Sequence, residues 1–415
     1  MSRDIVTWVE GLKGVAGVVI VFNHLRMCFW PETHDAMSAS GQSSWVQIPF
    51  LSLVCAGNLA VRLYFVLSGF ALCYRPLRLL EEERVSTVYD RTSQSLQSRF
   101  WRLLVPSAIA SATSLCLASL GAFSHSKTVC RAFSDTTPTA TALLADLWLW
   151  TKDSFLNMWV LGHHHFHDSL WCMRTLLVGS YLMYLLVILR ATARHTFWLW
   201  VAISCALLSP AVAAVNSTDL SSFVFGGIMA FVEANKAVQS DSSMQTSVSQ
   251  SIHFGAWVVM LLLSLFLGSY PSGDANAPWC LWMHSLVKLL GISNPRHIMI
   301  WWMNVSSFLI CLCISKLPWA QTVLNLKPVL YLGSTSFALF LVHPLILRSA
   351  GGHVFSVLHQ AGLGYDSAAL IMGLAALALS LVASHFWRTY VEIKAHRLVE
   401  KYLIMRTDSG PSLVK

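Results

Sequence analysis

Charge is the scarcest property of this chain. Only 12% of its 415 residues are Asp, Glu, Lys or Arg, whereas a soluble domain carries about 25%. Hydrophobic residues make up 55% of the chain, and the mean hydropathy is +0.58. This balance excludes an ordinary soluble enzyme. It predicts an all-α, polytopic bundle of transmembrane helices, because a helix satisfies its own backbone groups inside a bilayer.

The chain also lacks the cysteine and histidine spacings of a metal or redox site. The run His163–Asp168 reads His-His-His-Phe-His-Asp, but adjacent histidines do not share one face, and no carboxylate or cysteine completes a site at a recognised spacing. We therefore expect no metal, and expect the run to shape the entrance for a substrate. No CxxC motif is present, but a disulfide stays open among four cysteines on the predicted outer side: Cys28, Cys55, Cys130 and Cys280.

A cleavable signal sequence is missing as well. Glu10 and Lys13 interrupt the first apolar stretch, and no small-residue cleavage site follows it, so we expect this stretch to remain as a spanning helix. Internal repeats are also lacking. A transporter built from two matching halves would carry paired helix breaks, whereas Gly226-Gly227 and Pro344 are isolated. A non-enzymatic transporter is nevertheless kept as an alternative.

Windows of about 20 apolar residues mark spanning helices. The segment 142–160 is apolar but short, so we expect a re-entrant or interfacial helix there, and Gln239–Ser251 reads as a polar loop. All of 1–415 is predicted to form a single membrane-embedded domain. The expected spans lie near 5–27, 52–74, 101–122, 170–189, 196–214, 219–234, 253–269, 298–315, 329–348 and 365–387.

Lysine and arginine positions predict the orientation. They cluster between the second and third spans and in the C-terminal tail, and with ten spans these regions lie on one side. The positive-inside rule makes that side cytoplasmic, together with both termini. The net charge of +8 then needs no nucleic acid to explain it. We expect the endoplasmic reticulum as the default membrane for a chain without other targeting signals.

This topology places the sequence Asn216-Ser-Thr on the outer side, where it is a glycosylation acceptor. The alternative is that Asn216 lies too close to the membrane to be modified.

The first span carries three ionisable residues, Glu10, Lys13 and His24. Positions eleven apart fall on nearly the same helix face, roughly 16 Å apart along the axis, which relates Lys13 to His24. Glu10 precedes Lys13 by one turn and could pair with it. Ionisable groups are costly inside a bilayer, so their presence in a spanning helix indicates a functional site. The alternative is that Glu10 and Lys13 mark the membrane boundary while His24 caps the far end.

Two further motifs are candidates for a site. Ser68-Gly69 in the second span allows close helix packing. Arg99 and Arg102 share a face at the start of the third span, and guanidinium groups match phosphate oxygens. Together with the arginines that end the second span, Arg75 and Arg78, they could form a polyphosphate site. The alternatives are plain packing for the Ser-Gly pair and anchoring to anionic lipid for the arginines.

Taken in order, these motifs resemble the acyltransferase 3 family of integral-membrane acyltransferases, particularly its fungal branch. The resemblance covers essentially the whole chain. It rests on Trp8-Val-Glu-Gly-Leu-Lys13-Gly with His24, Tyr64-Phe-Val-Leu-Ser-Gly-Phe70, Arg99-Phe-Trp-Arg-Leu-Leu-Val-Pro106, Phe340-Leu-Val-His-Pro344 and Phe386-Trp-Arg388.

The resemblance implies residue roles. His24 becomes the catalytic histidine, with Lys13 as the basic residue of the first helix and Glu10 as its partner. His343 becomes a candidate for binding the acceptor, or else a packing histidine. Lys13 stands where relatives have arginine, and Leu176 stands where they often have glutamate. The donor site would comprise Arg99, Arg102, Arg75 and Ser68.

It also implies a reaction. An acyl group would pass from acyl-CoA, acetyl-CoA in our hypothesis, to a hydroxyl group, with His24 as general base near pH 7. Acyl-CoA is then a co-substrate, and no cofactor is bound. Fungal relatives of this size favour a lipophilic small-molecule acceptor in terpenoid, meroterpenoid or polyketide biosynthesis. The alternative acceptor is a cell-surface sugar or lipid.

Overall fold

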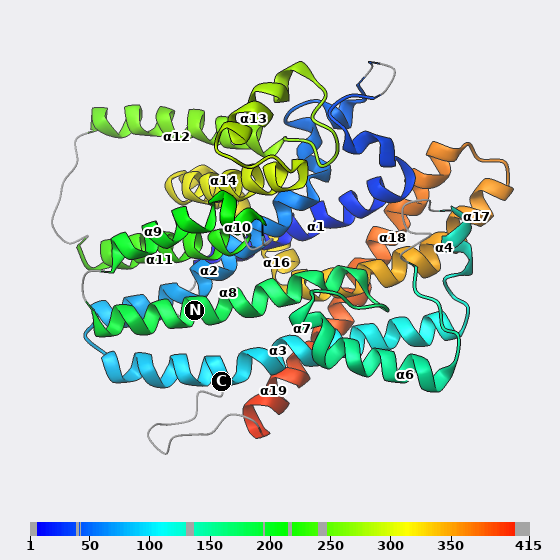
Figure 1. Cartoon of the computed structure of the whole chain (residues 1–415), viewed down its shortest axis with the longest axis horizontal. Helices are drawn as coiled ribbons and strands as arrows, with labels where there is room; N and C mark the ends of the chain where they lie inside the picture. The colour runs from blue at the N-terminus through cyan, green and yellow to red at the C-terminus, as the bar shows by residue number, and fades with distance from the viewer. Residues whose placement is uncertain are drawn as a thin grey trace.

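The computed structural model describes residues 6–38, 41, 43–129, 137–193, 196–214, 218–239 and 247–402. Within these ranges the chain is helical and contains no strand, which confirms the all-α prediction. The long helices lie side by side as a bundle, with α4 (Ser124–Val129) and α17 (Gly352–Gln360) together at one end and the turn from α2 to α3 at the other (Figure 1).

Seven helices of the described chain are long and apolar enough to cross a membrane. They begin in α1 (Thr7–Phe29), α2 (Gly57–Glu81), α3 (Val85–Ser119), the 3-10 turn Asp168–Trp171 that leads into α8 (Cys172–Thr192), α14 (Pro295–Lys316), α16 (Lys327–Ile346) and α18 (Tyr365–Trp387). Three shorter apolar helices, α9 (Phe197–Leu207), α11 (Leu220–Gln239) and α12 (Ser247–Gly268), occupy the other expected spans. Every apolar window therefore became a helix.

Several boundaries differ from the expected ones. The basic segment between the second and third spans is not a loop, because α2 continues to Glu81 and α3 begins at Val85. Pro76 lies inside α2 without ending it. The fifth span is interrupted after Leu207 and resumes as α10 (Pro210–Ala214), since proline favours the first turn of a helix. The predicted polar loop ends early, because α12 already starts at Ser247.

The doubtful segment 142–160 is helical. It consists of α6 (Leu143–Lys152), a π-helical turn (Asp153–Asn157) and α7 (Met158–Val160). Short amphipathic helices complete the chain: α13 (Pro278–Leu289), α15 (Pro318–Leu324) and α19 (Ile393–Tyr402). A π-helical turn, η6 (Leu347–Gly351), links α16 to α17, and a second, η7 (Arg388–Glu392), links α18 to α19.

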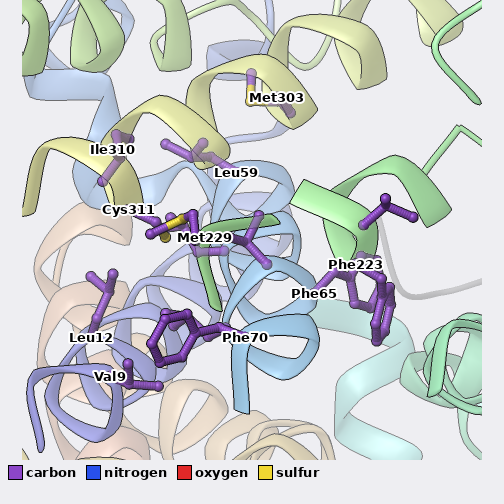
Figure 2. Close-up of a cluster of buried hydrophobic side chains, with 14 of the residues drawn as sticks. Val9, Leu12, Leu59, Phe65, Phe70, Phe223, Met229, Met303, Ile310 and Cys311 are labelled. Carbon is purple, nitrogen blue, oxygen red and sulfur yellow. The ribbon is translucent and has the colours of Figure 1, made fainter. Parts of the chain in front are cut away.

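The main hydrophobic core lies where α1, α2, α11 and α14 meet (Figure 2). Phe65 and Phe223 stack there with their ring centroids 5.3 Å apart. A Cβ atom added to Gly69 would overlap the carbonyl oxygen of Phe223, and one added to Gly226 would overlap that of Val66. The Ser68-Gly69 pair therefore does serve close packing, as the sequence predicted, because only glycine lets α2 and α11 approach this closely.

A second glycine contact joins α1 to α16. A Cβ atom on Gly14 would lie 2.5 Å from the amide nitrogen of Gly333, and one on Gly333 would overlap the carbonyl oxygen of Glu10. His24 follows Gly14 by ten residues, and His343 follows Gly333 by ten residues. The two helices start at the same end of the bundle, so the contact brings both histidines to the same height.

Candidate functional site

A cavity of about 320 Å³ opens between helices α1, α2, α3, α8 and α16. The acidic and basic residues that line it come from two helices predicted to carry the site, α1 and α3, and from the C-terminal helical segment. They are Glu10, Lys13, Arg99, Arg102, Glu392 and His396, and Ser68 lies beside them. Five residues taken from separate sequence motifs are thus brought together in one cavity.

Lys13 is held in place by two contacts. Its Nζ atom donates to Glu10 Oε1 at 2.6 Å, which confirms the predicted pair on one helix face. Its backbone carbonyl accepts a hydrogen bond from the hydroxyl of Tyr64 at 2.8 Å. Tyr64 itself lines the cavity. The ammonium group therefore lies at the wall of the cavity with a carboxylate beside it.

The two arginines of α3 differ in their surroundings. Arg99 donates from Nε to the hydroxyl of Ser180 on α8 at 2.9 Å, which orients its guanidinium group. Arg102 donates from Nη2 to Glu400 Oε1 at 2.9 Å, and this pair is partly exposed. A carboxylate of α19 therefore occupies one face of a guanidinium group on the cavity wall.

The C-terminal segment was missed by the sequence reasoning. Glu392 ends η7 and His396 lies on α19, and both line the cavity. Arg75, in contrast, is exposed and is not among the described lining residues. The polyphosphate hypothesis thus keeps Arg99 and Arg102 but gains no support at Arg75.

The cavity ends at a small hydrophobic cluster. Ile20 of α1 and Phe340 of α16 line it there, and Val61 of α2 packs in the same cluster. One helical turn further along these two helices stand His24 and His343. Neither histidine is among the residues that line the cavity in the described chain; they follow the lining residues Ile20 and Phe340 by four and three positions, a rise of about 4.5–6 Å.

His24 and His343 pack edge to face, with ring centroids 4.8 Å apart and an interplanar angle of 71°. The Nδ1 atom of His343 lies 2.9 Å from the carbonyl oxygen of Leu339. Because a carbonyl oxygen only accepts, Nδ1 carries the proton and Nε2 of the neutral ring is a bare acceptor. Nε2 is buried and has no hydrogen-bond partner within the described residues.

The histidine run contacts α16 two residues before His343. His167 lies with Nε2 2.9 Å from the carbonyl oxygen of Leu341 on α16. Burial lowers the pKa of His167, so its ring is neutral at pH 7. Asp168, the next residue, accepts a hydrogen bond from Arg348 Nη2 at 2.6 Å. We call His24, His343, His167, Asp168 and Arg348 the histidine centre.

Sequence reasoning had placed the histidine run at a substrate entrance but had not joined it to His24. A signal was present: Arg348 ends the span expected at 329–348, and a charge in such a segment needs a partner. The partner carboxylate, Asp168, stood in the run that had been considered for metal binding.

The rest of the histidine run has a structural role. His164 Nε2 lies 3.1 Å from the hydroxyl of Ser154, and the backbone amide of His165 donates to Asp153. Burial holds the pKa of His164 below its ordinary range despite the Asp153 carboxylate nearby. No group of three or more His, Cys, Asp or Glu residues in the described chain is arranged to hold a metal ion.

The predicted disulfide and the predicted glycosylation site differ in how far the described residues reach them. No disulfide joins any two of the three described candidates, Cys28, Cys55 and Cys280. The fourth candidate, Cys130, and the glycosylation candidate, Asn216, lie outside the described residues.

Comparison with known proteins agrees with this architecture. A family model described as "Acyltransferase domain", that of acyltransferase 3, matches residues 6–385. The chain belongs to the acyltransferase 3 family. The match includes α1, α2, α3, α8 and α16 of the cavity but neither η7 nor α19, and it includes all five residues of the histidine centre. Family membership agrees with the seven helices of the described chain that are long and apolar enough to span a membrane, so the protein is an integral membrane protein.

A curated relative points in the same direction. O-acetyltransferase PaAT-1 from Phomopsis amygdali is 30% identical over 103 residues, which is 25% of this chain and 20% of that protein. The aligned part thus covers only a fifth of the relative. No solved structure matches the chain.

Proposed function

We propose that this acyltransferase 3 protein transfers an acyl group, an acetyl group in our hypothesis, from acyl-CoA to a hydroxyl group of a lipophilic small molecule. The observation that carries the proposal is the short distance between two different environments. A cavity with three cationic side chains, Lys13, Arg99 and Arg102, ends one helical turn from a buried pair of imidazoles.

The cavity suits an anionic donor. Guanidinium groups bind phosphate oxygens with charge-assisted hydrogen bonds, and the diphosphate of acyl-CoA offers such oxygens to Arg99 and Arg102. Ser68 adds a hydroxyl group to the same wall. Lys13 lies about 16 Å below His24 along α1, a length that an extended pantetheine arm can bridge. The donor would reach the histidines by parting Ile20 from Phe340.

The histidine centre suits a hydroxyl acceptor. In our mechanism, His24 takes the proton of the acceptor hydroxyl as general base. The oxygen attacks the thioester carbonyl carbon, the carbon–sulfur bond breaks, and the CoA thiolate leaves with the proton that His24 then returns. We assign His343 to acceptor binding, because its bare Nε2 requires a hydrogen-bond donor.

We further propose that the end of the bundle where α2 turns into α3 faces the cytoplasm. Arg78, Arg84 and Arg190 gather around this turn, and all three pair with the glutamates at the C-terminal end of α2, Glu81 and Glu82. Positive charge favours the cytoplasmic side, where acyl-CoA is present. Both chain termini would then be cytoplasmic, the membrane that of the endoplasmic reticulum, and Asn216 glycosylated on the opposite side. Loss of a glycan on Asn216→Gln tests this arrangement.

Comparative mass spectrometry of strains tests the function. Extracts would be compared from the wild type, a deletion and a His24→Ala strain, with His353→Ala as a matched control. His353 also contacts a second histidine, His125, but lies on α17, outside the site. We expect one acylated metabolite to vanish in the deletion and in His24→Ala, with its hydroxy precursor accumulating, and to persist in His353→Ala.

A fungal secondary metabolite is the acceptor we favour, on the resemblance and on the partial similarity to a fungal O-acetyltransferase. The second candidate is a cell-surface sugar or lipid. It is favoured by one observation: the Asp168 side chain is 32% exposed although its partner Arg348 is buried, so the histidine centre borders the surface at the end away from the cavity. Acylated glycans or lipids that vanish in the deletion strain would select this candidate.

A further inference from the structure

The Asp168–Arg348 pair joins two segments that flank the histidines. Asp168 begins the 3-10 turn before α8, and Arg348 lies in η6, directly after the helix that carries His343. Arg348 is only 2% exposed. The pair is therefore a partly buried contact between elements 180 residues apart in sequence.

This pair is built differently from a second arginine–aspartate pair, Arg62 with Asp219. Arg62 donates two hydrogen bonds to Asp219, from Nε to Oδ1 at 2.9 Å and from Nη2 to Oδ2 at 3.0 Å. Asp168 uses only Oδ2 toward Arg348, and its Oδ1 atom is buried with no hydrogen-bond partner among the described residues. A pair that served only to hold the fold would gain from using both oxygens.

The unused oxygen belongs to a carboxylate beside the histidines. His167, the neighbour of Asp168, is fixed to the carbonyl of Leu341, two residues before His343, and His343 touches His24. Asp168 and Arg348 both interact electrostatically with His24. Asp168 is the carboxylate of this centre, whereas Asp153, in the π-helical turn Asp153–Asn157, already accepts hydrogen bonds from Asn157 and from the backbone amide of His165.

We propose that Asp168 is a positioning residue for His24. This inference rests on the proposed function. When His24 takes the acceptor proton, its ring becomes positive in a buried place, where an uncompensated charge is costly. The Asp168 carboxylate stabilises that imidazolium, and Arg348 fixes the direction of the carboxylate. Neither residue touches the donor in this scheme, so their effect falls on the chemical step.

The test is a steady-state comparison with purified protein in lipid nanodiscs. Acetyl-CoA is the donor, and the hydroxy compound that accumulates in the deletion strain is the acceptor. For Asp168→Asn we expect kcat to fall by about 10²–10⁴-fold while KM for acetyl-CoA stays within about twofold. Asp168→Glu keeps the charge and should retain at least tenfold more activity than Asp168→Asn.

A matched control removes a carboxylate elsewhere. Asp366→Asn weakens an exposed hydrogen bond to Trp30 at the N-terminus of α18, and its kcat should equal that of the wild type. If Asp168→Asn had an unchanged kcat, or if its loss appeared as a raised KM for acetyl-CoA, the inference would be overturned.

Arg348 supplies the second measurement. If the pair acts as a unit, the double variant Asp168→Asn with Arg348→Gln should lose no more kcat than the worse single variant. Multiplying losses would instead show two separate structural effects and would contradict the inference. Failure of the wild type to acetylate the compound would remove the proposed function itself, which separates the two hypotheses.

Discussion

The cavity and the histidine centre lie one helical turn apart and have opposite chemistry. The cavity is hollow and supplies hydrogen-bond donors, with Lys13, Arg99 and Arg102 on its walls. The histidine centre offers buried acceptor atoms without a hydrogen-bond partner among the described residues, such as His343 Nε2 and Asp168 Oδ1. A donor-rich region suits phosphates and an acceptor-rich region suits hydroxyl groups. In the proposed function, donor binding in the cavity and proton transfer at the histidine centre therefore occur at different heights along α1 and α16.

The largest expected effect falls on the histidine centre. His24→Ala should lower kcat by about 10³-fold, because a general base contributes 10²–10⁴-fold, and should leave KM for acetyl-CoA within about twofold. Initial rates in nanodiscs measure both constants, with His353→Ala as the control. A large rise in KM for acetyl-CoA would show that the two regions are not separate.

The cavity should give the reverse result. Arg99→Ala combined with Arg102→Ala should raise KM for acetyl-CoA by about 10–100-fold, because a hydrogen bond to a charged group contributes about 1.5–3 kcal/mol. The effect on kcat should be smaller. Acetyl-CoA titrations at saturating acceptor measure this split. An unchanged KM would exclude both arginines from the donor site.

The glycine contact between α1 and α16 supports both regions at once. Gly333→Ala should destabilise the protein by about 1–3 kcal/mol, since the new Cβ would overlap the Glu10 carbonyl and force the helices apart. Thermal unfolding in detergent measures the effect. Gly255→Ala is the control, because a Cβ there meets open space and alanine favours the helix. Equal melting temperatures for the two variants would contradict the close contact.

The smallest effect concerns α19. Glu400→Gln should lower KM for acetyl-CoA by about two- to fivefold, because Glu400 competes with a phosphate for Arg102, and an exposed ion pair contributes about 0.2–1 kcal/mol. The same titration measures it. A raised KM would mean that Glu400 assists donor binding.

Local patterns predicted much of this molecule. Apolar windows predicted ten helices, seven of which are long and apolar enough in the described chain to cross a membrane, because length and hydropathy are properties of contiguous segments. The pairing of Glu10 with Lys13 followed from helical spacing, and the motifs of α1, α2 and α3 supplied five cavity residues. The family model confirms the resemblance on which the residue roles depend, and those roles stay predictions.

Long-range contacts were not predictable in this way. The meeting of Asp168 with Arg348 depends on how η5 (Asp168–Trp171) packs on the end of α16, and no periodicity within either segment encodes it. Glu392 and His396 escaped notice because the tail read only as positive charge, whereas the structure folds it into a helix against α3. Site residues of this kind are recognised by the residues they contact, and those contacts are known only once the fold is known.

The contact between Gly14 and Gly333 fixes the relative height of α1 and α16. Each histidine lies ten residues beyond its glycine, a rise of about 15 Å along the helix. One residue inserted between Gly14 and His24 would move His24 by 1.5 Å along the helix axis and rotate it by about 100°, away from His343. Lys13, which precedes Gly14, would keep its position. One residue inserted in each of the two segments, Gly14–His24 and Gly333–His343, would move both histidines by the same amount. The number of residues between glycine and histidine must therefore change in both helices together if the histidine contact is to be kept.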